Sequence, residues 1–192
     1  MRALLFSGGI ESTCLAAIHQ PDLAITIDYG QKPAKGEVAA ATEIASLLGI
    51  RHEVLSAPLG SFGRGELVGD KATKNDPVPE HWPLRNQMLA TLVVMKHADD
   101  GLSELMIGTV ASDAVHSDGT PEFIERLDAL MKVQVPGIRI VAPAILTTTK
   151  ALVKDSGLGK DVLGWCFSCH RGPVACGSCR GCNKTIELLG SL

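Results

Sequence analysis

A glycine pair near the start of the chain carries a clear chemical signal. The apolar residues 3–6 lead into Ser7-Gly8-Gly9-Ile10-Glu11-Ser12, and a helical pattern opens directly behind this hexamer. Adjacent glycines let backbone N–H groups close on an anion, and a helix N-terminus adds partial positive charge at the same point. Because the hydroxyls of Ser7, Ser12 and Thr13 add further donors, we predict that this loop binds the phosphates of a nucleotide.

The hexamer differs from the two common glycine-rich phosphate motifs. It lacks the lysine that completes G-x-x-x-x-G-K-[ST], and its glycines do not follow G-x-G-x-x-G. A strand, a glycine pair and a helix can also form no more than a tight turn. On the hexamer alone, this alternative stays open.

Four cysteines near the end of the chain have the spacing of a tetrahedral metal site. Cys169, Cys176, Cys179 and Cys182 follow one another at the short intervals of an all-thiolate zinc site, with glycines that permit tight turns between them. We predict a structural Zn²⁺ at these thiolates. An iron–sulfur cluster is the alternative metal centre, and Cys166 is an alternative first ligand.

Composition favours one domain with a small appendage and chemistry on small molecules. The chain has 192 residues, of which 45% are hydrophobic, and a formal net charge of −3. This charge gives no basic footprint for an extended nucleic-acid surface. The apolar run at the start is too short for a signal peptide, and no stretch approaches the length of a membrane span. We therefore expect a cytoplasmic protein whose clustered cysteines bind a metal rather than form disulfides.

Short apolar runs alternate with helical patterns along the chain. The predicted strands cover residues 3–6, 23–27, 52–55, 105–108 and 138–141, and the predicted helices cover 12–19, 33–48, 83–99, 121–133 and 148–154. This alternation predicts an α/β fold with a five-stranded parallel sheet, helices on both faces and a ligand site beyond the carboxyl ends of the strands. The glycine loop and Asp28-Tyr29-Gly30-Gln31 fall at that edge.

The predicted domain organisation follows from the same patterns. Residues 1–160 form the nucleotide-binding domain, and residues 161–192 form a cysteine-rich tail. Residues 57–80 contain many glycines and prolines and show no sustained period. Because an irregular segment of this length is more often functional than a simple connection, we interpret it as a lid or binding loop.

Six segments in a defined order make a family resemblance specific. They are Ser7-Gly8-Gly9-Ile10-Glu11-Ser12, Asp28-Tyr29-Gly30-Gln31, Pro83-Leu84-Arg85-Asn86, Pro121-Glu122-Phe123-Ile124, Thr149-Lys150-Ala151, and the tail Phe167-Ser168-Cys169 with Cys176-Gly177-Ser178-Cys179 and Cys182. They resemble S-G-G-x-D-S, D-Y-G-Q, P-x-R-N, P-E-F-I, T-K-A and W-S-C…C-G-x-C-x-x-C of the QueC family. These 7-cyano-7-deazaguanine synthases are PP-loop ATP pyrophosphatases with a Rossmann-like fold of the HUP, adenine nucleotide alpha hydrolase-like, type.

The resemblance implies a ligase that forms C–N bonds. The family activates the carboxylate of 7-carboxy-7-deazaguanine with ATP and Mg²⁺, releases pyrophosphate, and lets ammonia attack to form an amide and then the nitrile of 7-cyano-7-deazaguanine. The resemblance also implies a homodimer and a place in queuosine biosynthesis. Attack at the α-phosphate makes pyrophosphate the leaving group, so donors and cations must hold the β,γ-phosphates.

The resemblance assigns roles to individual residues. The implied catalytic residues are Ser12, Arg85 and Lys150. The implied ATP-binding residues are Ser7, Gly8, Gly9, Glu11, Ser12, Thr13, Asp28, Tyr29, Arg85 and Gly108. The implied substrate-binding residues are Asn86, Asp113, Asp118, Glu122 and Phe123. Simpler alternatives stay open for Lys150 as a solvated charge, Tyr29 as an edge packing residue, and Asp118 as a turn residue before Gly119.

Departures from the family pattern leave other functions open. Glu11 replaces the loop aspartate, Phe167 replaces tryptophan, and Val115-His116-Ser117-Asp118-Gly119-Thr120 stands in place of Y-P-D-C-R. One alternative is a QueC-like ligase of antiviral defence, which joins the activated deazaguanine to an amine of a protein partner. Another is a non-catalytic zinc-knuckle module on an inactive PP-loop fold. A PP-loop tRNA thiolase is disfavoured because Cys14 is the one cysteine before Cys166 and the chain is acidic.

Overall fold

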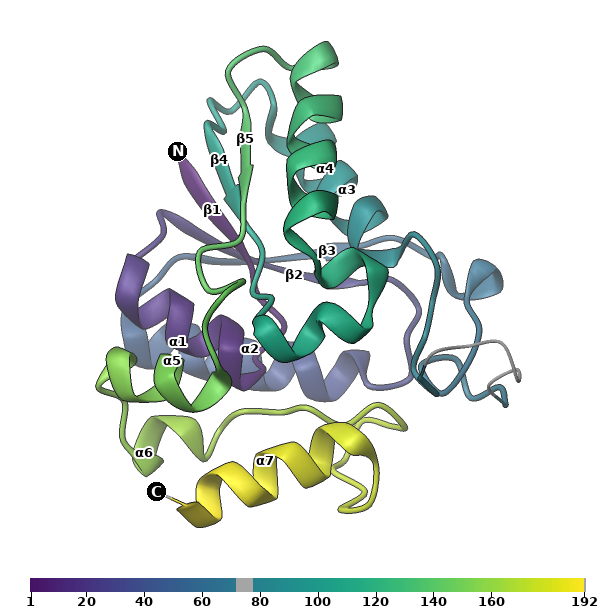
Figure 1. The fold of residues 1–192 in the computed structure, drawn as a ribbon, viewed down its shortest axis with the longest axis vertical. Helices are drawn as coiled ribbons and strands as arrows, with labels where there is room; N and C mark the ends of the chain where they lie inside the picture. Colours follow the sequence, from purple (N-terminus) through teal and green to yellow (C-terminus); the bar gives the residue numbers. More distant parts are fainter. Residues whose placement is uncertain (72–77, 192) are drawn as a thin grey trace.

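The computed structural model describes residues 1–71 and 78–191. Within them, one parallel sheet has the order β3-β2-β1-β4-β5, which Figure 1 shows. The strands are β1 Arg2–Leu5, β2 Leu23–Asp28, β3 His52–Ser56, β4 Glu104–Met106 and β5 Arg139–Val141. The central strand β1 pairs with both β2 and β4, with Ala3 opposite Leu23 on one side and Leu105 on the other. The predicted five-stranded parallel sheet is confirmed.

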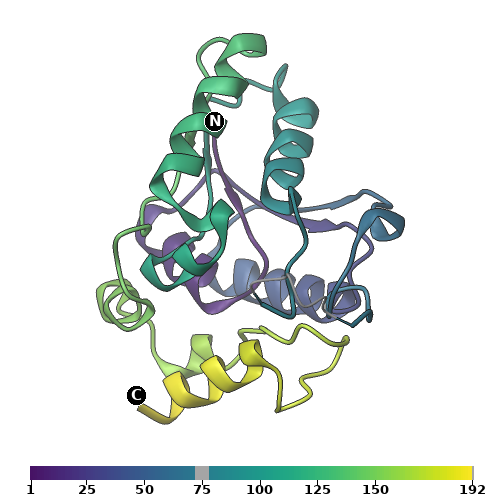
Figure 2. The same cartoon turned by 45° about the vertical axis from the view of Figure 1, so that its right-hand side comes forward.

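Helices cover both faces of the sheet, as predicted (Figures 1 and 2). On one face lie α1 Ile10–His19, α2 Ala34–Leu48 and α5 Thr149–Ser156, and on the other lie α3 Arg85–His97 and α4 Pro121–Gln134. Successive residues of a strand point to opposite faces. Ala3 accordingly belongs to the core beneath α3 and α4, whereas Leu4 belongs to the core shared with α1, α2 and α5.

Local sequence signals explain where two of the helices begin and end. Gly49 follows α2 with a φ of +67°, and its N–H donates to the carbonyl oxygens of Ala45 and Ser46. Thr120 precedes α4, its hydroxyl accepts from the Phe123 N–H at 3.2 Å, and Pro121 occupies the first helical position. These contacts satisfy backbone groups that a helix end otherwise leaves unpaired. A glycine after a helix and Thr-Pro before one are typical end and start signals, and the structure uses both as caps.

The burial of α3 differs from the prediction at its last residue. The helical pattern places His97 on a solvated flank, but the residue is 3% exposed. Its Nδ1 lies 2.9 Å from Asp100 Oδ2, and its Nε2 lies 3.5 Å from Glu53 Oε2. A polar ring is tolerated in such a position when carboxylates face it. The prediction for His97 is therefore wrong, because the partner on β3 comes from a distant part of the sequence.

The cysteine-rich tail forms a further layer against α1, α2 and α5 (Figure 2). It contains two helices absent from the sequence prediction, α6 Lys160–Leu163 and α7 Arg180–Ser191. Leu163 and Leu188 pack into the core on the α1 side of the sheet. Because the Phe167 N–H also donates to the Gly8 carbonyl oxygen at 2.9 Å, the tail is in direct contact with the glycine loop.

The segment predicted as a lid or binding loop is described except for residues 72–77, which lie outside the described residues. Within this segment, the short 3-10 helix η1 covers Gly60–Phe62. Two other 3-10 helices lie elsewhere, after β4: η2 covers Ala111–Val115 and η3 covers Ser117–Gly119. Leu67 is buried, and its carbonyl oxygen accepts from the Lys32 N–H at 2.8 Å. The described part of this segment thus packs at the carboxyl edge of the sheet. Its function as a lid stays a prediction.

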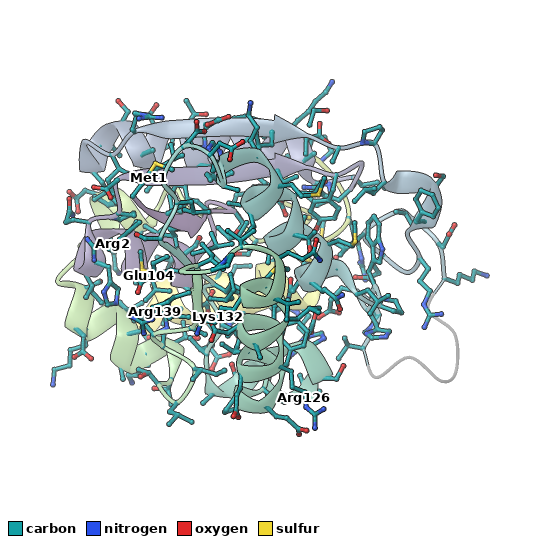
Figure 3. All side chains as sticks on the ribbon, turned by 90° about the horizontal axis from the view of Figure 1, so that it is seen from above. Met1, Arg2, Glu104, Arg126, Lys132 and Arg139 are labelled. Carbon is teal, nitrogen blue, oxygen red and sulfur yellow. The ribbon has the colours of Figure 1, made fainter. Side chains whose placement is uncertain are left out.

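Ion pairs occupy the opposite edge, where β1, β4 and β5 begin (Figure 3). Arg139 Nη1 lies 3.3 Å from Glu104 Oε2, and the amino group of Met1 donates to the Gly101 carbonyl oxygen at 2.8 Å. The cavity described next opens at the carboxyl edge, away from these charges.

None of the described helices has the length and apolar character needed to cross a membrane.

Candidate functional site

A cavity of about 330 Å³ lies at the carboxyl edge of the sheet. Its walls come from the glycine loop, the ends of β1 and β2, the start of α3, the segment after β4 and the cysteine tail. This is the edge at which parallel α/β sheets bind their ligands. The position of the predicted ligand site is thus matched by a cavity.

The glycine loop forms a tight junction between β1 and α1. Gly8 has a φ of +72°, and a Cβ there would lie 2.7 Å from the Ala41 nitrogen. Ser7 Oγ accepts from the Gly9 N–H at 3.3 Å, and the Ser12 hydroxyl donates to the Gly9 carbonyl oxygen at 3.1 Å. Ser7, Gly9 and Ser12 all line the cavity. The loop therefore presents hydroxyl groups and the start of α1 to a ligand.

Gly108 follows β4 and lets α1 approach the sheet closely. A Cβ at Gly108 would lie 3.4 Å from the Ser12 nitrogen, which is at the near limit of ordinary van der Waals contact. Gly108 also lines the cavity. Its missing side chain keeps the space beside Ser12 open.

Glu11 connects the glycine loop to two other helices. Its Oε1 accepts from the Thr149 hydroxyl at 2.7 Å and lies 2.5 Å from Lys184 Nζ. Thr149 begins α5, whereas Lys184 belongs to α7. Lys184 lines the cavity as well, so the tail supplies a cation next to the glycine loop. Sequence reasoning missed Lys184 because a single lysine behind the cysteines resembles an ordinary surface charge.

Arg85 enters the cavity from the first position of α3. The preceding residue, Leu84, has a φ of +64°, a left-handed conformation that is unusual for a residue with a side chain. The Arg85 guanidinium contacts the Tyr29 hydroxyl and lies near Glu37. Asn86, also predicted in the site, accepts from Arg85 Nε at 3.4 Å. The structure therefore brings Arg85, Asn86 and Tyr29 together at one wall of the cavity.

Tyr29 is a packed residue as well as a cavity residue. Its ring meets Trp82 edge to face, with centroids 5.2 Å apart, and it is 7% exposed. Burial raises the pKa of Tyr29 above its ordinary value, although the neighbouring Arg85 opposes the shift. The hydroxyl is therefore a neutral hydrogen-bonding group at neutral pH.

Glu37 is a cavity carboxylate that the sequence analysis missed. Its Oε2 accepts from Gln31 Nε2 at 2.7 Å. Burial raises the pKa of Glu37, whereas the Gln31 hydrogen bond and the Arg85 charge lower it. In the sequence, Glu37 resembles a solvated position of a long helix. The signal that could have found it is its spacing from Gln31 in the D-Y-G-Q segment.

Of the acidic residues after β4 that were predicted to bind the substrate, only some lie at the cavity. Asp113 and Asp118 line it. Asp113 Oδ2 already accepts from the Val110 N–H at 3.1 Å, so this carboxylate also holds the segment in shape. Glu122 instead points to solvent, with 71% of its side chain exposed, and pairs with Arg126 one turn along α4 at 2.7 Å.

Several other predicted site residues lie outside the cavity wall. Thr13 is fully buried, and its hydroxyl accepts from Cys166 Sγ at 3.5 Å. Asp28 Oδ1 accepts from the Gly30 N–H at 3.0 Å. Lys150 is exposed near the start of α5. Phe123 packs against the core beneath α3 and α4. For Thr13 and Phe123 the physical reason is helix periodicity, which turns these side chains toward the core.

Gly8 does not line the cavity but packs against α2 on the other side of the loop. Its carbonyl oxygen accepts from the Phe167 N–H, and its missing side chain lets α2 approach. The contact between Phe167 and α2 has a similar requirement, because a Cβ on Gly36 would lie 2.5 Å from Phe167 Cζ. Glycines at two positions therefore allow the loop, α2 and the tail to pack together.

A second polar cluster lines the cavity on the tail side. Glu80 Oε1 lies 2.9 Å from Arg180 Nη1 and 3.9 Å from His116 Nε2, and Glu80 Oε2 lies 3.9 Å from His170 Nδ1. Burial lowers the pKa of both His116 and His170. Their rings are thus mainly neutral at neutral pH. No sequence pattern marked this cluster, because its members come from three separate segments.

The four tail cysteines converge as the spacing predicted. Their Sγ atoms all lie within 4.8 Å of one another, and those of Cys176 and Cys182 are 3.9 Å apart. The backbone N–H groups of Cys179 and Cys182 each point at the sulfur three residues earlier, at 3.4 Å. Backbone donors from Ser178 and Cys179 lower the pKa of Cys176 to about 6, which favours a thiolate.

This donor set fits a tetrahedral metal ion. Four sulfurs that meet at one point suit Zn²⁺, and backbone N–H groups aimed at them stabilise the thiolate form. Cys166 lies outside the group and faces Thr13, and burial raises its pKa to about 11. Cys169, Cys176, Cys179 and Cys182 are therefore the four residues that could hold a metal ion, whereas the binding and the identity of the metal stay predictions.

The fold and these features define the class of the protein before any comparison. A Rossmann-like parallel sheet, a Ser-Gly-Gly junction after its first strand and a four-cysteine tail together describe a PP-loop protein with a metal knuckle.

Comparison with known proteins identifies the family. The model of the family described as "Queuosine biosynthesis protein QueC" matches residues 2–187, so this chain belongs to the QueC family. It is 32% identical to the 7-cyano-7-deazaguanine synthase of Thiobacillus denitrificans, over 96% of this chain and 91% of the relative. Similar relatives are the synthases of Solidesulfovibrio magneticus, 31% identical over 93% and 86%, and Methanocaldococcus jannaschii, 29% identical over 96% and 92%.

Proposed function

We propose that this chain uses ATP to adenylate the carboxylate of a 7-deazaguanine-type substrate and then lets ammonia convert the acyl group to an amide and a nitrile. The observation that carries the proposal is the convergence of Ser7, Ser12, Arg85 and Lys184 on one cavity at the carboxyl edge. Relatives that match nearly the whole chain are named 7-cyano-7-deazaguanine synthases. In this proposal, the hydroxyls and cations of the cavity bind the triphosphate, and the substrate binds in the same cavity.

In the first step, a carboxylate oxygen of the substrate attacks the α-phosphorus of ATP. The bond from that phosphorus to the bridging oxygen breaks, and pyrophosphate leaves with the electron pair. The hydroxyls of Ser7 and Ser12 and the start of α1 are placed to hold the departing phosphates. Lys184 and Arg85 add positive charge from α7 and α3. Mg²⁺ accompanies ATP and neutralises phosphate charge.

In the second step, ammonia attacks the acyl carbon, AMP leaves and the nitrogen loses a proton to give the amide. A second ATP then adenylates the amide oxygen with release of pyrophosphate, and loss of AMP with that oxygen and of both protons from the nitrogen gives the nitrile. The neutral rings of His116 and His170 line the same cavity and are suitable groups to accept the proton. The metal in the tail is structural in this proposal, because all four of its positions are taken by cysteines.

The substrate contacts are also a proposal. We place the heterocycle near Asn86, Asp113 and Asp118, which all line the cavity. Glu122 is not part of this proposal, because it pairs with Arg126 on the outer surface of α4. Lys150 remains a catalytic candidate only if its exposed side chain turns toward the loop when ATP binds.

Pyrophosphate exchange tests the adenylation. Labelled pyrophosphate should enter ATP only when 7-carboxy-7-deazaguanine is present, and AMP should be the nucleotide product. Glutamine hydrolysis is not required, because the test uses free ammonia. Release of ADP, or exchange that ignores the carboxylate, would contradict the proposal.

A protein amine is the second candidate acceptor. The observation that favours it is the segment Val115-His116-Ser117-Asp118-Gly119-Thr120, which departs from the family pattern where an acceptor would be chosen. Intact-mass analysis separates the two outcomes. With ammonia as acceptor, the nitrile forms and proteins keep their mass. With a protein acceptor, the partner gains the mass of the deazaguanine acyl group.

A further inference from the structure

Glu80 is a buried carboxylate with one oxygen that lacks a donor. Its side chain is 7% exposed, and its Oε1 is paired with Arg180 at 2.9 Å. Its Oε2 has no hydrogen-bond partner among the described residues. An unpaired buried oxygen of this kind costs free energy unless a ligand or water supplies a donor. Because Glu80 lines the cavity, the missing donor is available from whatever fills it.

The neighbours of Glu80 do not fill this need. His170 Nδ1 lies 3.9 Å from Oε2, which is too far for a hydrogen bond, and it also has no partner among the described residues. His116 Nε2 is equally distant from Oε1. Arg180 Nη1 meanwhile donates to Oε1 at 2.9 Å and fixes the orientation of the carboxylate. Glu80 and His170 both line the cavity, and each has one buried side-chain atom without a partner among the described residues.

Three other carboxylates at the cavity already have a hydrogen-bond donor. Glu11 Oε1 has Thr149 and Lys184, Glu37 Oε2 has Gln31, and Asp113 Oδ2 has the Val110 N–H. Glu80 thus differs from them, since a buried oxygen of its side chain has no donor in the described part of the chain. A ligand that brings N–H groups gains most by binding at Glu80.

We propose that Glu80 recognises the donor edge of the substrate heterocycle, the ring N–H and the exocyclic amine of a 2-amino-4-oxopyrimidine ring. This inference rests on the proposed function for the presence of such a ring. Two parallel N–H donors match the two oxygens of one carboxylate. A ring without the exocyclic amine loses one of these bonds, and a ring with an acceptor at that edge faces a negative charge. Glu80 therefore selects guanine-type over adenine-type rings.

A metal ion is the competing occupant of this corner. Ligand atoms of Glu66, Glu80 and His170 lie within 4.8 Å of one another. However, Glu66 Oε1 already receives two N–H groups of Arg171, at 2.7 and 3.0 Å, and Glu80 is paired with Arg180. Two guanidinium groups thus balance the two carboxylates, and a divalent cation would add unbalanced positive charge. The charges favour a neutral N–H donor.

Calorimetric binding to the metal-loaded chain of 192 residues tests the inference. The probes are 7-carboxy-7-deazaguanine and its analogue without the 2-amino group. The wild-type protein should bind the first compound at least about tenfold more tightly, because one charge-assisted hydrogen bond separates them. Glu80→Gln should lose most of this preference by weakening the first compound. Glu66→Gln is the matched control, since Glu66 does not line the cavity, and it should keep the preference.

The melting temperature of each variant shows whether it is folded. A second variant, Glu80→Asp, keeps the negative charge but shortens the side chain. It should also bind the 2-amino compound less tightly. Full preference in both Glu80 variants would overturn the inference, as would a wild-type protein that binds neither compound. The competing metal site would be shown if the wild-type protein bound a second metal ion besides the one in the cysteine-rich tail, and if Glu80→Gln and Glu66→Gln both lost that second ion. Binding with the expected preference but without pyrophosphate exchange would remove the proposed adenylation and leave this inference standing.

Discussion

Lys184 Nζ lies 2.5 Å from Glu11 Oε1, which joins the helix after the cysteines to the glycine loop at the start of the chain. Thr149 donates to the same oxygen, so α1, α5 and α7 meet at one carboxylate. Glu11 stands where the QueC pattern has aspartate. The longer side chain reaches both partners, and the cysteine-rich tail thereby lines the cavity together with the glycine loop.

This relationship predicts a functional role for Lys184. Lys184→Met should raise the KM for ATP or lower the exchange rate by about tenfold or more, because a cation beside the phosphates is lost. The melting temperature should change little, since the ion pair is partly exposed and such pairs contribute little to stability. Steady-state pyrophosphate exchange measures the first effect. Lys160→Met, an exposed lysine of α6, is the control, and equal activity of the two variants would refute the role.

Arg85 should be needed for chemistry more than for folding. Arg85→Ala removes a cation from the cavity wall and leaves Glu37 and Tyr29 without their positive neighbour. We expect a folded protein with exchange reduced by about a hundredfold, and a partial recovery in Arg85→Lys. Circular dichroism checks that the variant is folded, and pyrophosphate exchange measures its activity. Arg126→Ala changes only a pair on the surface of α4 and should behave as wild type.

Gly8 should be sensitive to substitution for two separate reasons. Gly8→Ala places a side chain at a φ of +72° and a Cβ 2.7 Å from the Ala41 nitrogen. Gly49→Ala shares the left-handed conformation, at a φ of +67°, but meets nothing within 4 Å. The left-handed conformation alone costs about 1 to 2 kcal/mol. Urea unfolding should show a larger loss for Gly8→Ala, and equal losses would mean that the close approach to α2 does not matter.

The metal should stabilise the tail and through it the cavity. Cys179→Ser should lose bound metal and lower the melting temperature, because a structural site contributes folding free energy directly. Cys166→Ser should keep the metal, since Cys166 faces Thr13 outside the four-sulfur group. Elemental analysis measures the metal content and distinguishes zinc from the iron of an iron–sulfur cluster. Equal metal content in the two variants would contradict the assignment of the ligands.

The sequence was sufficient for features that depend on near neighbours. The apolar runs at residues 3–6 and 23–27 became β1 and β2, and Thr120-Pro121 began α4, because burial of a strand and capping of a helix are local requirements. The convergence of the four cysteines also depended only on near neighbours in the sequence. Their spacing alone was enough to predict that they converge, because thiolates so close along the chain can surround one ion without help from the rest of the fold.

The tertiary structure decided which charges share the cavity. Arg180 meets Glu80 across 100 positions of the chain, and no periodic pattern links such distant residues. Lys184 reached Glu11 in the same way, whereas Lys150 and Glu122 stayed at the surface although their motifs resemble those of the family. Motifs record which side chains are present, but the packing of α7 against the glycine loop determines which of them face a ligand.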